Sequence, residues 1–183
     1  MWAAPAEYSL FRSADGSMAL PYPAGWVALG EEKDTVTIAS SFDALQLSLT
    51  EAYGELAPGD SLGIAALVPT SVLGLPPGTA DAAALSRILN AMMNTADWKE
   101  ELEEYGVTSS PFPATTVGGR TFAGVSFAGK LSGIYVAYEL QPGTLVSLLY
   151  IHQGPRNLAA EQNVLWSASQ VSAHGHAPAL ETR

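Results

Sequence analysis

The chain has 183 residues and a mass of 19.1 kDa, which fits one domain. It has no cysteine, which excludes a disulfide framework, a thiolate zinc site, an iron–sulfur cluster and a cysteine nucleophile. Eight Lys and Arg stand against 18 Asp and Glu, for a formal net charge of −10. Nucleic-acid binding depends on clustered Lys and Arg, so this balance argues against it, and a hydrophobic content of 48% argues against disorder.

The first part of the chain predicts short strands. Tyr8–Ser13 and Ser17–Tyr22 flank Ala14-Asp15-Gly16, and Asp-Gly between two β-prone runs is typical of a hairpin turn. Thr35–Ala39 predicts a further strand, and the alternating run Leu45–Thr50 predicts a half-buried one. An acidic turn precedes these two strands and consists of Glu31, Glu32, Lys33 and Asp34.

Residues 51–78 predict a long connection. Glycines and the prolines at 69, 76 and 77 prevent a long regular element. A short helical piece is expected at Ser61–Leu67, with Asp60 as its N-cap. A loop of this length is uncommon inside a compact domain and often serves a function.

The main helical region is predicted over residues 80–105. Thr79 is the expected N-cap, a break is expected at Asn94-Thr95, and Gly106 stands where a helix-ending glycine belongs. Apolar residues recur at helical spacing and form one stripe that faces a core, made of Leu85, Ile88, Leu89, Met92 and Ala96.

The second half of the chain predicts an antiparallel meander with strands at Arg120–Phe127, Gly133–Leu140 and Thr144–His152. The last two strands carry apolar residues on both faces, whereas a sheet with one wet face would carry polar residues there. We therefore expect helices on both sides, one from residues 80–105 and one at Leu158–Ser172.

These patterns predict an α+β fold, an α/β/α sandwich whose central antiparallel sheet is covered by helices on both faces. The expected organisation is a lead-in at 1–7, a single domain at 8–172 and a C-terminal tail at 173–183. No run of 18 apolar residues exists, which argues against a transmembrane segment. The first residues lack a basic and an apolar region, as expected for a chain without a signal peptide.

One short motif carries a family resemblance. The segment Asp15–Trp26 ends in Tyr22-Pro23-Ala24-Gly25-Trp26, and the chain follows the order meander, helix, meander, helix. In both respects it resembles the PsbP-like superfamily, which includes the photosystem II extrinsic subunit PsbP and Ran-binding Mog-type proteins. The resemblance implies an α/β/α sandwich and, for bacterial members, an exported protein or lipoprotein. We expect Trp26 itself to be a core anchor.

Several short patterns partly match known chemical sites. Gly124-Val125-Ser126-Phe127-Ala128 nearly matches a nucleophile elbow, but a strand follows the turn where a helix should, so Ser126 is expected to be an ordinary strand residue. His174 and His176 are too few for a zinc site, and they fall in the expected tail. The acidic clusters at 31–34 and 100–104 are expected to be wet surfaces. No catalytic set, metal site or cofactor is predicted.

The sequence therefore favours a non-catalytic protein-interaction module outside the cytoplasm, in the role of an accessory subunit. A lipid anchor on a removed leader and a cytosolic location are both left open. A small-molecule or lipid-binding protein that uses the region around 51–78 is the alternative. If a protein partner is bound, the residues expected to meet it lie in the 51–78 connection and in the acidic turn, namely Leu73, Leu75, Glu31, Glu32 and Asp34.

Overall fold

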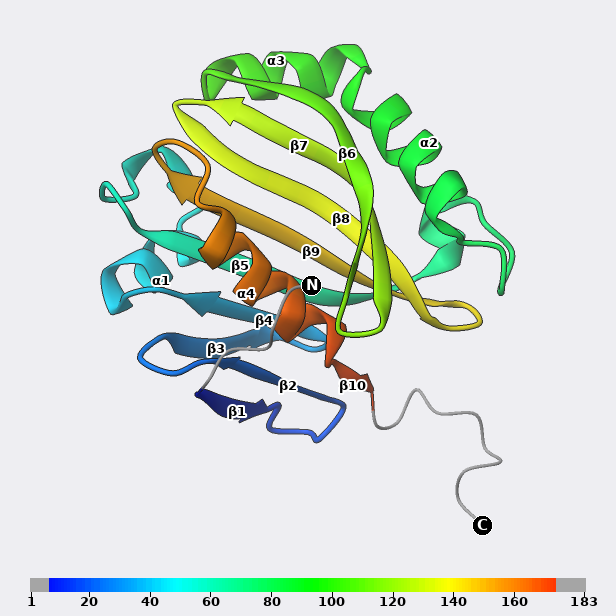
Figure 1. The fold of residues 1–183 in the computed structure, drawn as a ribbon, viewed down its shortest axis with the longest axis horizontal. Coiled ribbons are helices and arrows are strands. Elements are labelled where there is room, and N and C mark those ends of the chain that lie inside the picture. The colour runs from blue at the N-terminus through cyan, green and yellow to red at the C-terminus, as the bar shows by residue number, and fades with distance from the viewer. Residues whose placement is uncertain (1–6, 174–183) are drawn as a thin grey trace.

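The computed structural model describes residues 7–173, except for the side chain of Glu31 (Figure 1). Seven antiparallel strands form the main sheet, and a smaller three-stranded sheet lies beside it. In spatial order the main sheet contains β3 (Val27–Glu32), β4 (Thr35–Ala39), β5 (Ser61–Pro69), β9 (Thr144–Gln153), β8 (Leu131–Gln141), β7 (Arg120–Gly129) and β6 (Val107–Val117). The small sheet contains β1 (Tyr8–Arg12), β2 (Met18–Pro23) and β10 (Ser172–Ala173).

Helices lie on both faces of the main sheet. One face carries α1 (Phe42–Leu49), α2 (Ala82–Met93) and α3 (Ala96–Glu104), which pack against side chains of β5, β6, β7, β8 and β9. The other face carries α4 (Leu158–Ser169) together with β2. Two short 3₁₀ turns, η1 (Tyr53–Glu55) and η2 (Thr70–Leu73), flank β5. No helix within residues 7–173 is long and apolar enough to cross a membrane.

The predicted sandwich is confirmed, and its cause is the two-faced apolar pattern of β8 and β9. Val136 and Leu148 point toward α4 and pack with Leu165, whereas Ala137 and Leu145 point the other way, toward α2. Since successive side chains of a strand point to opposite faces, a strand that is apolar at every position needs cover on both sides. The hydroxyl of Tyr138 also donates to the carbonyl of Ala168 over 2.6 Å, which ties α4 to the sheet.

The strand predicted at Leu45–Thr50 is wrong, because this segment belongs to α1. Ser41 caps the helix, since its side chain accepts a hydrogen bond from the backbone N–H of Ala44. Ala44, Leu45 and Ser48 are buried at helical spacing, whereas Leu49 is exposed. A cap and a short amphipathic helix explain the pattern better than alternation does.

The helical piece predicted at Ser61–Leu67 is also wrong. The segment is β5, a central strand that pairs with β4 on one side and β9 on the other. A strand buried on both faces shows a continuous apolar run without alternation, so it cannot be told from a short helix by period alone. The long connection is therefore interrupted by a strand in the middle of the sheet.

The break in the main helical region is confirmed, and several boundaries move. Asn94 ends α2, and Gly106 adopts a positive φ of 64° after α3, as predicted. The N-cap of α2 is Asp81 and not Thr79. The C-terminal helix ends at Ser169, and Ala173, placed in the tail, pairs with β2.

Besides β5 and β10, two further strands were not predicted. β3 includes Glu31 and Glu32, which were expected in the acidic turn, and β6 follows α3 directly. Pro111 and Pro113 obscure β6 in the sequence, yet β6 is an edge strand, where a residue without an N–H donor is tolerated.

Trp26 packs against the core on the α4 side, as predicted, but it is half-buried. Truncation of Trp26 to Ala is therefore expected to cost less than the roughly 3–5 kcal/mol that a fully buried aromatic side chain contributes. Trp26 lies just beyond the end of β2, and its backbone N–H donates to the carbonyl of Pro23 over 3.1 Å.

The position of β5 predicts the effect of truncating Leu62, whose side chain is 0% exposed. Leu62→Ala is expected to lower the free energy of unfolding by about 2–5 kcal/mol, because it leaves a cavity in the centre of the domain. Val72→Ala is the matched control, since Val72 is 68% exposed and follows in the same segment. Urea unfolding measures both. Equal stability of the two variants would contradict the central position of β5.

Candidate functional site

The residues predicted to bind a partner lie at one end of the main sheet. Asp34 forms the β3–β4 turn with a positive φ of 64°, and its carbonyl accepts from the N–H of Leu67 over 2.8 Å. Glu32 is exposed at the end of β3, and the side chain of Glu31 lies outside the described part of the chain. Leu73 and Leu75 are half-buried against the α2 side of the core. Their role in binding stays a prediction.

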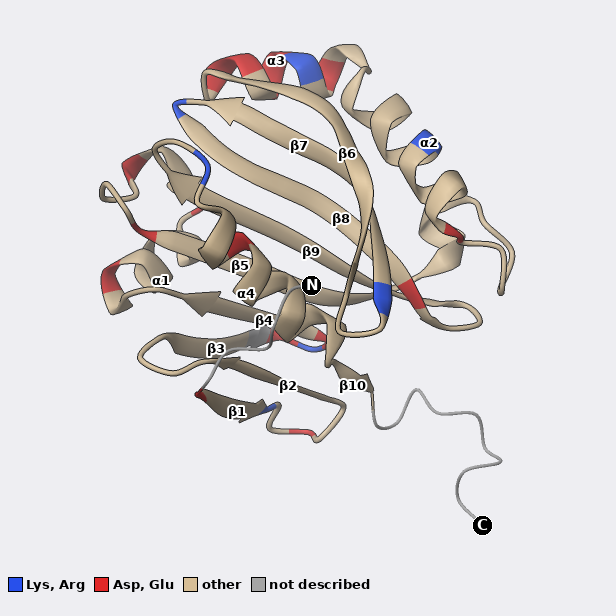
Figure 2. Ribbon diagram, viewed as in Figure 1, with Lys and Arg blue, Asp and Glu red and all other residues tan. Residues whose placement is uncertain are grey.

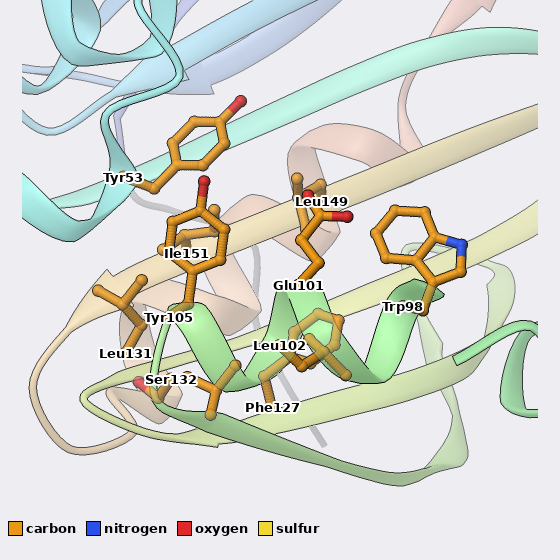
Figure 3. A pocket seen from close by; sticks show the side chains of 11 residues that line it. Tyr53, Trp98, Glu101, Leu102, Tyr105, Phe127, Leu131, Ser132, Leu149 and Ile151 are labelled. Carbon is orange, nitrogen blue, oxygen red and sulfur yellow. The ribbon is translucent and has the colours of Figure 1, made fainter. Parts of the chain in front are cut away.

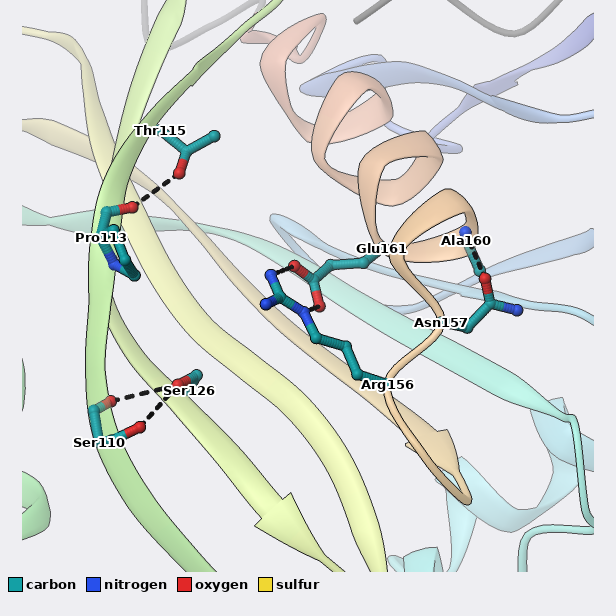
Figure 4. Close-up of polar contacts among 8 residues, drawn as sticks. All are labelled: Ser110, Pro113, Thr115, Ser126, Arg156, Asn157, Ala160 and Glu161. Carbon is teal, nitrogen blue, oxygen red and sulfur yellow. Dashed lines mark hydrogen bonds and ion pairs between the residues drawn. The ribbon is translucent and has the colours of Figure 1, made fainter.

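Ser126 does not meet a base. Its hydroxyl lies 3.0 Å from that of Ser110 on the neighbouring strand (Figure 4). The described histidine, His152, instead places Nδ1 2.6 Å from the hydroxyl of Ser61, which in turn lies 3.2 Å from the hydroxyl of Tyr150. This Ser–His pair was not predicted, because its members are 91 residues apart along the chain.

The Ser61–His152 pair belongs to the interior. Ser61 is 1% exposed and His152 is 5% exposed, so a substrate has no access to either side chain. Burial lowers the pKa of His152, and the nearby charge of Asp60 opposes that shift in part. The pair therefore satisfies buried polar groups where β5 meets β9.

A buried carboxylate on the α4 side is likewise paired. Glu161 is 1% exposed and accepts two hydrogen bonds from the guanidinium of Arg156, one of them from Nε over 3.0 Å (Figure 4). Asn157 caps the same helix by accepting from the N–H of Ala160. These contacts fix the start of α4, and they leave the carboxylate occupied.

Metal binding finds no support in the described part of the chain. Within residues 7–173 no three His, Asp or Glu side chains converge in an arrangement that could hold a metal ion. His174 and His176 lie outside the described residues.

An open pocket of about 110 Å³ lies under α3 (Figure 3). Its wall is α3, its floor is the sheet face of β8 and β9, and η1 closes one side. The lining is almost entirely apolar and aromatic. It consists of Tyr53, Trp98, Glu101, Leu102, Tyr105, Val107, Phe127, Leu131, Ser132, Leu149 and Ile151.

The pocket exists because α3 only partly covers the sheet. Trp98, Leu102 and Tyr105 recur at helical spacing, so they share the face of α3 that looks at the pocket. No residue of α3 is fully buried, although Leu102 and Tyr105 pack against the core. The helix therefore leaves apolar surface uncovered between itself and the strands.

The floor of the pocket is aliphatic. Leu149 and Ile151 alternate along β9 toward this face, and Leu131 joins them from β8. Gly133 is paired in register with Ile151 on one side and Phe127 on the other, and it contributes no side chain. A Cβ at this position would collide with the backbone carbonyl of Tyr150, so the glycine allows β8 and β9 to lie close together beneath the pocket.

The pocket carries a negative charge at its mouth. Glu101 is the one ionisable carboxylate in the lining, and Figure 3 shows its side chain between the rings of Tyr105 and Trp98. Burial raises the pKa of Tyr105, and the charges of Glu101, Glu51 and Glu104 raise it further. Figure 2 shows that several residues along the ribbon of α3 are acidic.

The acidic residues at 100–104 predict a wet face, and the aromatic face of the same helix was not predicted. The signal was present, since Trp98 and Tyr105 stand seven residues apart, two helical turns. What the sequence could not show is that Tyr53 and Phe127 meet them. The ring centroids of Tyr53 and Tyr105 lie 6.3 Å apart.

Sixteen chains among the solved structures resemble this one, and two of them are described here. No protein-family model and no curated protein match the chain. A protein of Bacteroides thetaiotaomicron matches with 8% identity and a TM-score of 0.46 over 91% of this chain, which spans 48% of that protein. The solution structure of the cyanobacterial PsbP of Synechocystis matches with 10% identity and a TM-score of 0.49, over 92% of this chain and 94% of that protein. Membership of the PsbP-like superfamily stays a prediction.

The buried histidine predicts a loss of stability in acid. Because the pKa of His152 is lower in the folded chain than its unfolded value of about 6.5, protonation favours the unfolded state. The contribution of neutral His152 to the free energy of unfolding is complete above about pH 6.5, and it is lost as the pH falls through the lower pKa of the folded state. We expect the urea concentration at the unfolding midpoint to decrease when the pH is lowered from 7.5 to 5.5. In His152→Gln this decrease is expected to be smaller.

The double variant His174→Gln, His176→Gln is the matched control for this measurement, because it removes histidines outside the described residues. It is expected to keep the full pH dependence. A control that loses the dependence, or a His152→Gln variant that retains it, would contradict the assignment.

Proposed function

We propose that this chain is a non-catalytic binding protein and that its ligand enters the pocket under α3. One observation carries the proposal. Four aromatic rings and several aliphatic side chains surround an open hollow of about 110 Å³ whose lining holds a single carboxylate. Ligand sites are typically concave and apolar, with a few polar groups that orient the ligand.

The surroundings of the pocket support binding without chemistry. The lining offers no histidine, lysine or arginine, and Glu101 has no acid or base partner in it. A general acid or base works only within hydrogen-bond reach of the group that it serves, and nucleophiles need such a neighbour. The Ser61–His152 pair, which has such a neighbour, is closed to solvent.

The size of the pocket limits what enters. A volume of about 110 Å³ holds one compact group and not a long acyl chain. The remainder of a larger ligand would stay at the open mouth, beside Trp98, which is 37% exposed. This favours the small-molecule alternative over a lipid that is fully enclosed.

Filling the pocket is predicted to abolish ligand binding. Leu149→Phe adds atoms to a half-buried side chain of the floor, so we expect stability within about 1 kcal/mol of the original and loss of fragment binding in ligand-observed NMR. Leu158→Phe is the matched control, because Leu158 is exposed at the start of α4, on the other side of the sheet. Fragments that bind both variants equally would place the site elsewhere.

A second candidate is a protein partner at the segment Thr70–Leu75. Val72 is 68% exposed there, between side chains that pack inward, and exposed apolar groups on an ordered segment are suited to partner contact. The exposed Glu32 and the Asp34 turn lie at the same end of the sheet. The PsbP-like motif at Tyr22–Trp26 supports an accessory subunit outside the cytoplasm, which we propose as the setting of this candidate.

The exposed valine separates this interface from a packed loop. Val72→Ser is expected to leave the free energy of unfolding within about 0.5 kcal/mol and to abolish co-purification of a partner from the source cell envelope. The double variant Leu73→Ser, Leu75→Ser is expected to lose stability as well, because both side chains contact the α2 cluster. A partner that is retained by Val72→Ser would exclude the interface.

A further inference from the structure

We infer that the pocket under α3 is selective for an organic cation, an alkylated ammonium group, and this rests on the proposed function of that pocket. Three features converge on it, namely the aromatic rings of the lining, the carboxylate among them and the excess of negative charge on α3. A neutral apolar ligand would use only the first.

The rings supply the first part of the recognition. Trp98, Tyr53, Tyr105 and Phe127 come from three separate parts of the chain and surround one hollow. The face of an aromatic ring is negative, so a cation held within about 6 Å of several rings is attracted to each of them. An alkylated ammonium group is expected to bind most tightly. Its methyl groups make apolar contacts with the lining, and its positive charge is attracted to the ring faces.

Glu101 supplies the second part. Figure 3 shows its carboxylate between Trp98 and Tyr105, so a cation seated between these rings lies beside an opposite charge. The lining contains no Lys, Arg or His that could form an ion pair with this carboxylate. The carboxylate can therefore be neutralised by the ligand.

The charge of α3 supplies the third part. The helix carries five carboxylates against the single lysine Lys99, and no basic residue stands in its last turn. The carbonyl end of a helix is itself partly negative, and here it points toward Tyr105. An anion would be repelled at this mouth, and a cation would be drawn to it.

One basic group near the pocket, Lys130, would repel a bound cation. The stem of Lys130 runs over Gly106, at the turn between β7 and β8. Lys130 is exposed and does not line the pocket, so solvent screens its charge there. Lys130→Gln is accordingly expected to strengthen cation binding slightly.

The test compares choline with its uncharged isostere, in which a quaternary carbon replaces the nitrogen. The two probes have the same shape, so their difference reports the charge. We expect NMR titration of the full chain to show choline binding at the Trp98 indole, at least about tenfold tighter than the isostere. Sodium chloride is expected to weaken choline and to leave the isostere unchanged.

The variants assign that preference to named groups. Trp98→Ala is expected to weaken choline about tenfold by removing one ring. Glu101→Gln is expected to weaken choline about two- to fivefold and to leave the isostere unaffected, because Glu101 is exposed to solvent. Glu100→Gln is the matched control, since Glu100 is exposed on the same helix and does not line the pocket.

The outcomes separate this inference from the proposed function. Equal binding of choline and its isostere would overturn the cation preference and keep the pocket as an apolar binding site. If neither probe binds, and if Leu149→Phe does not reduce fragment binding, both the cation preference and the proposed binding function would be contradicted. Choline binding that is unchanged in Trp98→Ala and Glu101→Gln would overturn the inference as well, because the cation would then be bound elsewhere.

Discussion

The pairing of β5 with β9 joins a three-stranded and a four-stranded meander that would otherwise be separate sheets. Its register runs from Ser61 opposite His152 to Pro69 opposite Thr144. On one side β5 carries β4 and β3, and on the other β9 carries β8, β7 and β6. Because this junction is the middle of the sheet, both of its faces need cover, and α4 and the helices of the opposite face supply it.

How far the sequence predicts this fold depends on which pattern each segment shows. β8 and β9 are apolar at nearly every position, so the sequence predicted two covered faces before any contact was known. The same uniformity concealed β5, where the run from Leu62 to Val68 has no period that separates strand from helix. α1 was missed for the opposite reason, since its leucines alternate although only Leu45 is buried. Local pattern fails where tertiary burial selects among several compatible structures.

The candidate site lies further from the sequence than the fold does. Its aromatic wall is visible as the spacing of Trp98 and Tyr105, but their partners Tyr53, Phe127 and Leu149 lie up to 96 positions apart along the chain. Only the strand order brings them to one hollow, because it places β9 and β8 beneath α3 and leaves η1 at its side. Hairpin pairs can be predicted from sequence patterns, whereas a pocket built from four distant segments cannot.

The contrast between the two faces of the sheet explains why the proposed binding site lies under α3. On the α4 side the buried polar groups Glu161 and Tyr138 have partners inside the protein, and the aliphatic residues around them are fully packed. Under α3 no helical residue is fully buried, so Trp98 and Tyr105 keep water-exposed apolar surface. Removal of such surface from water is favourable by about 25 cal/mol per Å². A ligand that covers this surface would gain binding free energy from apolar area that remains exposed after folding. Such a ligand would also stabilise α3, the least buried helix of this face.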